Sequence, residues 1–477
     1  MDICIANVLE ATGGRLVQGD PAATLHGVAT DSRQVTPGDL FVALAGERFD
    51  GHDFVARAFE AGAGAAVVGR WPDGLATDRP VVRVPYTADA YGALGAWWRR
   101  RMPARVVGIT GSNGKTTCKE MIAHLLGALG PTVCSEANHN NHVGVPETLL
   151  RIRSEHRFAV VEMGTNHLGE LEPLASLARP DVGLVTNIGP THLAAFGSEE
   201  GVAREKGHLL DAIAPGGLAV LSADDYWSRQ LAEAHPGRTA TFGLSDDADW
   251  HVAHLAQGES EIRFVVAQTG DAVTAPVVGR WQVANCLAAI AVAAEMGLSV
   301  SEAAARLASF QSPKWRMNVR RIDDFTLLLD CYNANPASML GALGELERRP
   351  CPGRRVVVLG DMLELGQVSA AAHRELGRLV AGASIDLLCA VGPEAFLMVG
   401  EALCSGMLPT NIFWSNDRAM AARWLCYRLR PNDTVLLKGS RGMRLEEVAD
   451  AVVAWAEQPL SDRPVCQACC GSPAPAG

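Results

Sequence analysis

The stretch GITGSNGKTT, residues 108–117, joins an apolar segment to an amphipathic one and decides the fold of this chain. The residues before it, 105–110, form a short β-branched run that is typical of a buried parallel strand. After it, apolar residues recur at three- and four-residue spacing from Met121 to Leu129, which predicts a helix that stops at Gly130-Pro131. The sequence therefore predicts a strand, a glycine-rich loop and a helix.

This loop is suited to holding a polyphosphate. Glycines let backbone N–H groups approach phosphate oxygens at a helix N-terminus, where unpaired donors and the helix dipole favour anions. Lys115 can reach the terminal phosphates, and the Thr116 hydroxyl can bind Mg²⁺. The chain has Ile109 where the general P-loop has its first glycine, so the motif is a TGxxGKTT variant. A tight turn without a nucleotide is the alternative. The predicted nucleotide contacts in the loop are Gly111, Ser112, Asn113, Gly114, Lys115, Thr116 and Thr117.

Length and composition bound the class of protein. A chain of 477 residues is too long for one core, and about three domains are expected. The net charge of −11 argues against a nucleic-acid partner, because a phosphate backbone would be repelled. The 12 cysteines are scattered and the N-terminus lacks a secretory signal pattern, so a reducing cytoplasm is expected. No apolar run is long enough to span a bilayer, so no stable membrane insertion is expected.

The order of motifs along the chain predicts an α/β protein of three domains. Residues 1–100 read as a small α/β domain, and 101–312 as a central P-loop domain with a doubly wound, mostly parallel sheet. Residues 313–457 alternate strands and helices again, as in a Rossmann-like domain. In the tail, 458–477, Cys466, Cys469 and Cys470 could bind a metal, but the surrounding Pro, Gly and Ser favour a flexible segment.

Several further motifs resemble those of the Mur ligases, over nearly all residues up to about 455. They are DSR at 31–33 with PGDLFVALAGERFDGHDF at 37–54, GSNGKTTCKE at 111–120, NHNN at 138–141, VVEMGTNHLGE at 160–170, DCYNANP at 330–336, GDMLELG at 360–366 and KGSRGM at 438–443. The YNANP and GDMLELG segments discriminate best, because related ligases differ there. They favour the family member that joins D-alanyl-D-alanine to UDP-N-acetylmuramoyl-tripeptide.

The resemblance implies a function for each domain and a reaction. The first domain is expected to bind a UDP-sugar, the second ATP, and the third to complete the ligase site. A substrate carboxylate is expected to take the γ-phosphoryl group, and an amine then displaces phosphate from the acyl phosphate. ATP, two Mg²⁺ ions and a carbamylated Lys206 are the implied cofactors. The partners are expected to be small molecules, and the protein a cytoplasmic monomer in peptidoglycan precursor synthesis.

The resemblance also implies a set of metal ligands, namely Thr116, Glu162, His192 and carbamylated Lys206. From the residues alone, Glu162 at a strand end beside a P-loop favours Mg²⁺ binding over a helix cap. His192 alone would be a hydrogen-bonded loop histidine, and Lys206 alone a solvated helix residue. Lys115, Lys206 and His192 are the expected catalytic residues.

Three residues beyond the loop are implied to meet the nucleotide: Asn285 at the adenine, Arg316 at the phosphates and Asp330 at the ribose. From the residues alone, Asn285 could instead be an amide on a helix surface, and Arg316 and Asp330 could form an ion pair between domains. The chain has Trp281-Gln282 where the family carries His-Asn, which puts the packing of the base in doubt.

Polar loop residues are the candidates for binding the other substrates, although ordinary loop polarity and Asx-turns would also explain them. The candidates are Ser32, Arg33, Arg48 and Asp50 for the sugar nucleotide, Asn138, Asn140 and Asn141 for the sugar or peptide, and Asn333 and Asn335 for the dipeptide. The sequence does not indicate which side chain acts as the general base for the amine.

Other functions remain open at this point. A folylpolyglutamate synthase has a similar loop, but the first domain and YNANP argue against it. A non-catalytic nucleotide switch would not need Glu162, His192 and Lys206 together. The Mur ligase that adds the third residue is the nearest rival, although the chain lacks the DNPR segment of its diaminopimelate-using members. The sequence does not say whether the tripeptide ends in lysine or diaminopimelate.

Overall fold

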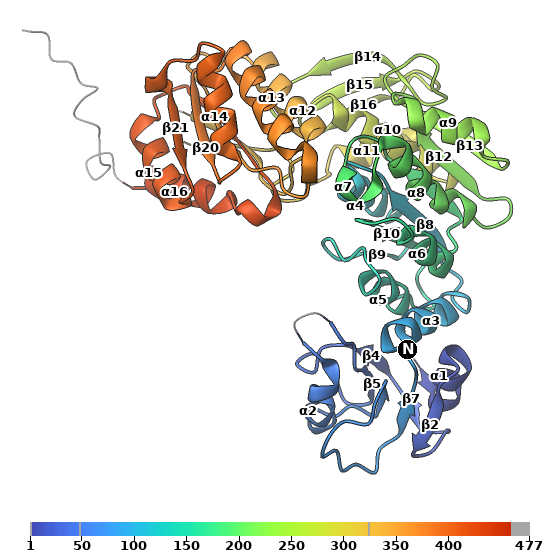
Figure 1. Cartoon of the computed structure of the whole chain (residues 1–477). Helices are drawn as coiled ribbons and strands as arrows, with labels where there is room; N and C mark the ends of the chain where they lie inside the picture. The colour runs from blue at the N-terminus through green and yellow to red at the C-terminus, as the bar shows by residue number, and fades with distance from the viewer. Residues whose placement is uncertain (1, 47–48, 323–324, 459–477) are drawn as a thin grey trace, which may run out of the picture.

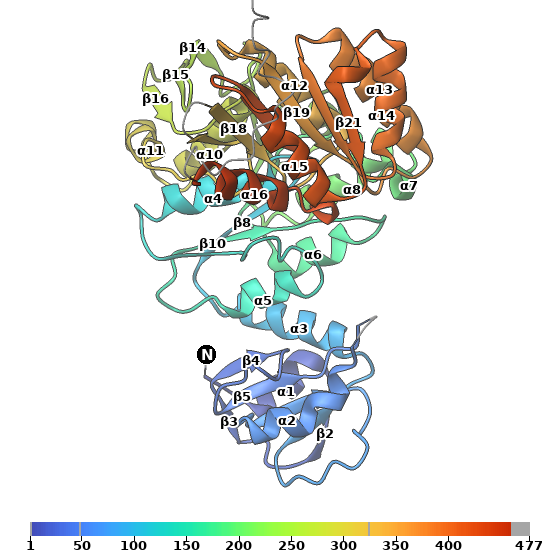
Figure 2. The ribbon, with the colours of Figure 1, turned by 90° about the vertical axis from the view of Figure 1, so that its left-hand side faces the viewer.

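The computed structural model describes residues 2–46, 49–322 and 325–458. Three α/β domains follow one another along the chain, and the first lies below the other two (Figure 1). Figure 2, turned by 90°, shows the central domain between the N-terminal domain and the C-terminal one. Arg48 and the cysteine cluster Cys466, Cys469 and Cys470 lie outside the described residues.

The N-terminal domain has a five-stranded sheet of order β2-β7-β6-β5-β4, in which only β2 runs antiparallel to its neighbour. Two apolar clusters cover its faces, because alternate residues of each strand point to opposite sides. Its elements are β1 (Ile3–Cys4), α1 (Ile5–Thr12), β2 (Arg15–Gln18), β3 (Thr24–Leu25), β4 (Gly27–Ala29), β5 (Asp39–Val42), α2 (Val55–Glu60), β6 (Ala65–Val68) and β7 (Val81–Arg83), with a 3₁₀ turn at Gly51–Phe54.

Helix α3 (Thr87–Arg99) connects the first domain to the second. Its Trp97 and Trp98 belong to the apolar core of the N-terminal domain. The Trp98 indole also donates a hydrogen bond of 2.8 Å to the carbonyl of Ile152, and Arg99 pairs with Asp181 at 3.3 Å. One helix therefore contributes to both domains.

The central domain is built on six strands in the order β13-β12-β11-β8-β10-β9, all parallel. Helices α4, α10 and α11 cover one face and α5, α6 and α8 the other, so the sheet is doubly wound as predicted. The elements are β8 (Arg105–Thr110), α4 (Lys115–Leu126), β9 (Thr132–Cys134), α5 (Gly144–Leu150), β10 (Phe158–Glu162), α6 (Leu171–Ala178), β11 (Val182–Val185), α7 (Leu193–Phe196), α8 (Glu199–Asp211), β12 (Leu218–Ser222), α9 (Tyr226–Ala234), β13 (Arg238–Phe242), α10 (Trp281–Glu295) and α11 (Val300–Leu307).

A separate antiparallel sheet interrupts this domain, which the sequence pattern did not indicate. It consists of β14 (Val252–Gln257), β15 (Ile262–Val266) and β16 (Ala272–Ala275). Residues from β15 and β16 join the same apolar cluster as α10 and α11. The end of β14 reaches the C-terminal domain, where the Gln257 amide donates to the carboxylate of Glu345.

The C-terminal domain has a second six-stranded sheet, of order β17-β18-β22-β19-β20-β21, in which β17 alone is antiparallel. Apolar clusters fill both of its faces, as in a Rossmann-like fold. Its elements are β17 (Asn318–Ile322), β18 (Phe325–Asp330), α12 (Pro336–Arg348), β19 (Arg355–Gly360), α13 (Ser369–Gly382), β20 (Leu387–Val391), α14 (Ala395–Cys404), β21 (Ile412–Ser415), α15 (Arg418–Arg428), β22 (Thr434–Lys438) and α16 (Glu446–Ala456), with 3₁₀ turns at Gly366–Val368, Pro409–Asn411 and Arg441–Met443.

The nine cysteines in the part of the chain that the structure describes are all free thiols. Within the same residues, none of the helices combines the length and the apolar content that crossing a bilayer requires.

Candidate active site between the central and C-terminal domains

A cavity of about 1050 Å³ lies where the central and C-terminal domains meet. Both walls come from the carboxyl ends of parallel strands, which is where open α/β sheets bind ligands. The predicted site residues that line it are Ser112, Asn113, Gly114, Lys115, Thr116, Thr117, Asn138, Asn140, Asn141, Glu162, His192, Asn285, Arg316, Asp330, Asn333 and Asn335. The motifs that are dispersed in sequence thus converge on one space.

The glycine-rich loop between β8 and α4 has the backbone that its sequence requires. Gly111 and Gly114 have φ values of 145° and 86°, in the region that favours glycine. A Cβ on Gly114 would lie 2.6 Å from Oδ1 of Asn285, so a larger residue would displace that amide. Lys115 donates a hydrogen bond of 2.6 Å to the carbonyl of Gly111, and burial lowers its pKa.

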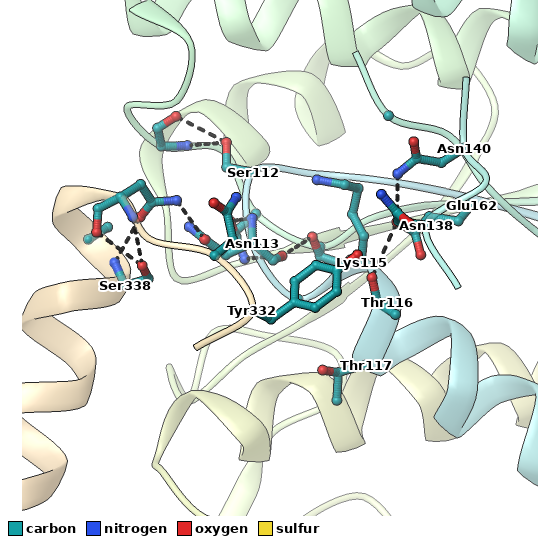
Figure 3. Close-up of a pocket in the computed structure, with 18 of the residues that line it drawn as sticks. Ser112, Asn113, Lys115, Thr116, Thr117, Asn138, Asn140, Glu162, Tyr332 and Ser338 are labelled. Atoms are coloured by element: carbon teal, nitrogen blue, oxygen red, sulfur yellow. Dashed lines mark hydrogen bonds between the residues drawn. The ribbon is translucent and has the colours of Figure 1, made fainter. Parts of the chain in front are cut away.

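Glu162, at the end of β10, holds its carboxylate in the buried wall beside α4 (Figure 3). Its Oε1 accepts from the Thr116 hydroxyl at 3.3 Å and from the amide of Asn140 at 2.9 Å. The other oxygen, Oε2, is buried and has no hydrogen-bond partner among the described residues. A buried carboxylate oxygen without a partner is costly unless a cation binds it.

His192 stands at the start of α7 with a left-handed backbone, φ 49°. Its ring packs edge-on against Phe196, and Nδ1 lies 3.2 Å from a carboxylate oxygen of Glu364 in the C-terminal domain. Burial lowers the pKa of His192, while the Glu364 carboxylate opposes that shift. The neutral imidazole, which is the form that binds metals, is therefore favoured.

Lys206 is buried in α8, with 2% of its surface exposed, so the alternative of a solvated helix residue, which the residues alone favoured, is wrong. It shares a helix face with Val202 and Leu209, both fully buried, at the three- and four-residue spacing that a packed face requires. Burial, together with the nearby charge of Lys115, lowers the pKa of Lys206 well below 10.5. The side chain does not line the cavity itself, but it lies close enough to Lys115 for that charge to lower its pKa, and close enough to His192 to lower the pKa of the imidazole.

The C-terminal domain contributes two contacts to the loop. Arg316 donates from Nη2 to the Thr116 hydroxyl at 3.1 Å and stacks its guanidinium 3.9 Å from the ring centre of Tyr332. Asn335 donates from Nδ2 to Oδ1 of Asn113 at 2.8 Å. Figure 3 shows Tyr332 beside Lys115 and Thr116, and Ser338 in the first turn of α12.

Asp330 and Lys438 pair at the ends of two adjacent strands, β18 and β22, where they are register partners. Lys438 Nζ lies 2.6 Å from Oδ2 of Asp330 and also donates to the carbonyl of Asn333 at 3.0 Å. This lysine is 2% exposed and lines the cavity. Asp330 is therefore an anionic group fixed in direction, as a contact to ribose hydroxyls requires.

The loop that carries Asn138, Asn140 and Asn141 follows β9, and Lys119 binds its backbone. The buried ammonium of this residue donates to the carbonyls of Ser135 at 2.7 Å and Ala137 at 2.9 Å. Asn141 folds back as a turn residue, with Oδ1 accepting from the N–H groups of Val143 and Gly144. Asn138 and Asn140 remain beside the cavity (Figure 3).

Comparison with known proteins decides the family. The models described as Mur ligase family, catalytic domain, as Mur ligase middle domain and as Mur ligase, glutamate ligase domain match residues 24–96, 109–293 and 315–441. A relative from Escherichia coli, named UDP-N-acetylmuramoyl-tripeptide--D-alanyl-D-alanine ligase, is 37% identical over 95% of this chain and 98% of its own. The chain belongs to the Mur ligase family.

Solved structures agree with this assignment. A MurF structure from Acinetobacter baumannii matches with a TM-score of 0.87 and 31% identity, over 95% of this chain and 99% of that one. MurF ligase from Thermotoga maritima in complex with ADP matches with a TM-score of 0.81 and 29% identity, over 91% and 98%. A relative from Bacillus subtilis with the same name as the Escherichia coli protein is 33% identical, over 96% of this chain and 99% of that protein.

Three predicted substrate residues of this Mur ligase do not line the cavity: Ser32, Arg33 and Asp50 lie in the N-terminal domain. Arg33 pairs with Asp31 at 2.6 Å. Asp50 caps the 3₁₀ turn Gly51–Phe54 and accepts from the ring of His52 at 2.5 Å and from Arg70 at 3.1 Å. Any role of theirs with substrate stays a prediction.

Several lining residues of this Mur ligase had not been assigned a role from sequence. They are Asp224, Asp225, Gln282, Tyr332 and Lys438. Tyr332 and Lys438 lie in the motifs YNANP and KGSRGM, and this position could have indicated from the sequence that they belong to the site. Gln282 accepts a hydrogen bond of 2.8 Å from Asn285. The glutamine that this chain has in place of the family's His-Asn pair therefore fixes the buried amide of Asn285. Asp224 and Asp225 carried no signal beyond their position after a strand.

Proposed function

We propose that this Mur ligase joins D-alanyl-D-alanine to UDP-N-acetylmuramoyl-tripeptide, with conversion of ATP to ADP and phosphate. The observation that carries the proposal is the cavity between the two domains, in which the phosphate loop faces the YNANP segment of the C-terminal domain. The names of the relatives from Escherichia coli and Bacillus subtilis support the pair of substrates. The enzyme acts as a cytoplasmic monomer on these small molecules.

The reaction has two steps. In the first, an oxygen of the terminal carboxylate of the tripeptide attacks the γ-phosphorus of ATP, the bond to the β-phosphate oxygen breaks, and ADP leaves. In the second, the amine of D-alanyl-D-alanine attacks the acyl carbon, the bond to the phosphate oxygen breaks, and the amine loses a proton. Phosphorylation converts the carboxylate oxygen from a poor leaving group into a good one.

The loop residues orient and neutralise the triphosphate. The N–H groups at the start of α4 and the ammonium of Lys115 bind phosphate oxygens, and Arg316 adds a second cation from the other domain. Burial lowers the pKa of Lys115, and the negative charge of a bound polyphosphate would act in the opposite direction and favour the ammonium. Asn285, whose amide lies beside Gly114 in the cavity, contacts the adenine, and Asp330 accepts from the ribose hydroxyls.

The residues present fit Mg²⁺, since Glu162 has a buried carboxylate oxygen without a partner and Thr116 places a hydroxyl beside it. The described residues contain no group of three or more His, Cys, Asp or Glu side chains that could hold a metal. The proposed set of Thr116, Glu162, His192 and carbamylated Lys206 contains only two such residues. Two Mg²⁺ ions would offset the negative charge of the phosphoryl group and the acyl phosphate.

Carbamylation of Lys206 would account for a lysine buried near the charge of Lys115. Its neutral amine attacks the carbon of CO₂, forming a C–N bond and releasing one proton, and the product is an anionic carbamate. Burial favours the neutral amine that this addition needs. The carbamate replaces a charge that would repel Lys115 with an oxygen ligand for a hard cation.

Phosphate release from ATP tests the proposed function. We expect release with UDP-N-acetylmuramoyl-tripeptide and D-alanyl-D-alanine together, and formation of one amide for each phosphate. The tripeptide ending in lysine and the one ending in diaminopimelate are assayed side by side. Release with UDP-muramoyl-dipeptide and a diamino acid would indicate the ligase that adds the third residue, and release with a folate and glutamate would indicate a folylpolyglutamate synthase. Either result contradicts the proposal.

A further inference from the structure

The side chain of Asn335 links two domains. It is 8% exposed and forms the N-cap of α12, where Oδ1 accepts from the N–H of Ser338 at 2.8 Å. Its nitrogen, Nδ2, donates to Oδ1 of Asn113 in the phosphate loop at 2.8 Å. Both polar atoms of the amide are therefore engaged. The acceptor and one of the two N–H donors of this amide are thus used within the protein.

Asn113 is fixed from the other side by the end of β11. Its N–H donates to Oδ1 of Asn187 at 3.0 Å, and its carbonyl accepts from the Thr186 hydroxyl at 2.6 Å and from the amide of Asn187 at 3.0 Å. These bonds fix the backbone of the loop. The side chain of Asn113 makes its hydrogen bond to Asn335 of the C-terminal domain. A continuous hydrogen-bonded path thus runs from β11 through Asn113 to α12.

Asn333 differs from Asn335 although it lies only two residues earlier. It is exposed, it lines the same cavity, and its amide makes no hydrogen bond to another of the described residues. Its backbone carbonyl accepts from Lys438, which fixes its position but leaves the side chain available. Of the two asparagines in YNANP, Asn333 is the one placed to meet a substrate.

We propose that Asn335 is a positioning residue, which ties the placement of the C-terminal domain to the conformation of the phosphate loop through Asn113. This inference rests on the proposed function. When the C-terminal domain brings the amine to the cavity, the same movement gives Asn113 its side-chain donor and completes the loop for phosphoryl transfer. Separation of the domains removes that donor. The acyl phosphate then forms only in the arrangement that can consume it.

The variant Asn335→Ser isolates the link. Serine is as good an N-cap as asparagine, so α12 keeps its start, but the shorter side chain does not reach Asn113. We expect kcat to fall about 10-fold, the effect of losing one hydrogen bond, with KM for D-alanyl-D-alanine within about 2-fold of wild type. Asn335→Asp keeps both the cap and the reach. Since the Asn113 amide can turn to donate to a carboxylate, this variant is expected to recover most of the lost activity.

A matched control is Asp417→Ser, which changes the N-cap of α15 in the same domain, away from the loop. It is expected to shift the melting temperature as much as Asn335→Ser and to leave kcat unchanged. In a double-mutant cycle, Asn113→Ala combined with Asn335→Ser is expected to be no slower than Asn113→Ala alone. Small-angle X-ray scattering provides a readout apart from activity. ADP is expected to reduce the radius of gyration of wild type and of Asp417→Ser, and to reduce that of Asn335→Ser less.

The inference is overturned if Asn335→Ser matches wild type in kcat and in the response to ADP, or if the losses in the double variant add. It is also overturned if a large increase in KM for D-alanyl-D-alanine accounts for the defect, since Asn335 would then bind the dipeptide. Failure of the proposed function is distinguishable, because wild type would then form no amide with D-alanyl-D-alanine while the scattering experiment would still test the link.

Discussion

Arg316 of the C-terminal domain donates a hydrogen bond to the hydroxyl of Thr116, the first residue after the phosphate-loop lysine, across 3.1 Å. The guanidinium carbon lies 3.9 Å from the centre of the Tyr332 ring, which helps to hold the group beside the loop. Its Nε is buried without a hydrogen-bond partner among the described residues. A cation fixed in this way adds to the phosphate site only when the two domains meet.

Replacement of Arg316 by alanine is therefore expected to lower kcat about 100-fold, the scale found for removal of one preorganised donor at a developing negative charge. The measurement is phosphate release under saturating substrates. Arg423→Ala, an exposed arginine of α15, is the control and is expected to retain wild-type rates. Equal rates for both variants would exclude a role of Arg316 at the phosphates.

Lys206→Ala is expected to lose activity, and added short carboxylates such as formate or acetate are expected to restore part of it. The physical reason is that a small anion can enter the space of the missing carbamate and supply an oxygen ligand. In wild type, removal of CO₂ should lower activity, and added bicarbonate, which equilibrates with CO₂, should restore it, because burial favours the neutral amine that reacts. A fully active alanine variant would refute the proposed metal ligand.

Gly366→Ala tests the second place at which the C-terminal domain touches the central one. Gly366 has φ 57°, and an added Cβ would lie 2.5 Å from Cβ of Ala194 in α7. We expect the larger residue to hold the GDMLELG loop away from His192 and to lower kcat about 10-fold. Gly406→Ala is the matched control, because Gly406 also has a positive φ, 98°, but an added Cβ meets nothing within 4 Å, so kcat should be unchanged.

Glu345 is expected to be essential for the stability of the C-terminal domain. Its side chain is 0% exposed, lies 3.5 Å from Arg349 and accepts from Gln257 of the antiparallel sheet. Glu345→Ala leaves a buried arginine without its carboxylate, and the free energy of unfolding of this domain should fall by about 3 kcal/mol. Urea denaturation followed by tryptophan fluorescence measures the loss. Glu347→Ala, on an exposed position of α12, should change stability by less than about 0.5 kcal/mol.

The stability of the N-terminal domain is expected to depend on pH through Asp50. Although its partial burial acts in the opposite direction, hydrogen bonds from His52 and Arg70 lower the pKa of Asp50 to about 2, from 3.8. The folded state therefore binds this proton less readily than the unfolded state, and the stabilisation is present above pH 3.8 and lost as the pH falls toward 2. Urea midpoints at several pH values should fall less steeply in Asp50→Asn than in wild type; identical slopes would contradict the assignment.

The sequence predicted the central strands and the loop because their signals are local. The run at 105–110 and the apolar spacing after Lys115 each depend on a few neighbouring residues, and the strand and helix formed as expected, although α4 ends at Leu126 rather than at Leu129. The Glu162 carboxylate also lies where its strand end predicts. Parallel strands place such residues at one edge of a sheet whatever the rest of the chain does.

The remaining features depend on contacts between distant segments. For Lys206, the residues alone favoured a solvated position and only the family resemblance indicated a metal ligand, yet the burial of Val202 and Leu209 around it could have been inferred from their spacing. The sheet of β14 to β16 has short strands whose alternation is weak, since only some of their residues pack on α10. The link between Asn335 and Asn113 joins positions 222 residues apart and left no local pattern.

Helix α3 limits how this enzyme can be divided. Trp97 and Trp98 contribute to the core of the first domain, while the Trp98 indole and Arg99 are bonded to Ile152 and to Asp181 of the second. Cutting the chain at residue 100 would expose the two tryptophans to water along the surface that they share with α5. An exchange of the N-terminal domain between relatives must therefore preserve the contacts that α3 makes with both domains.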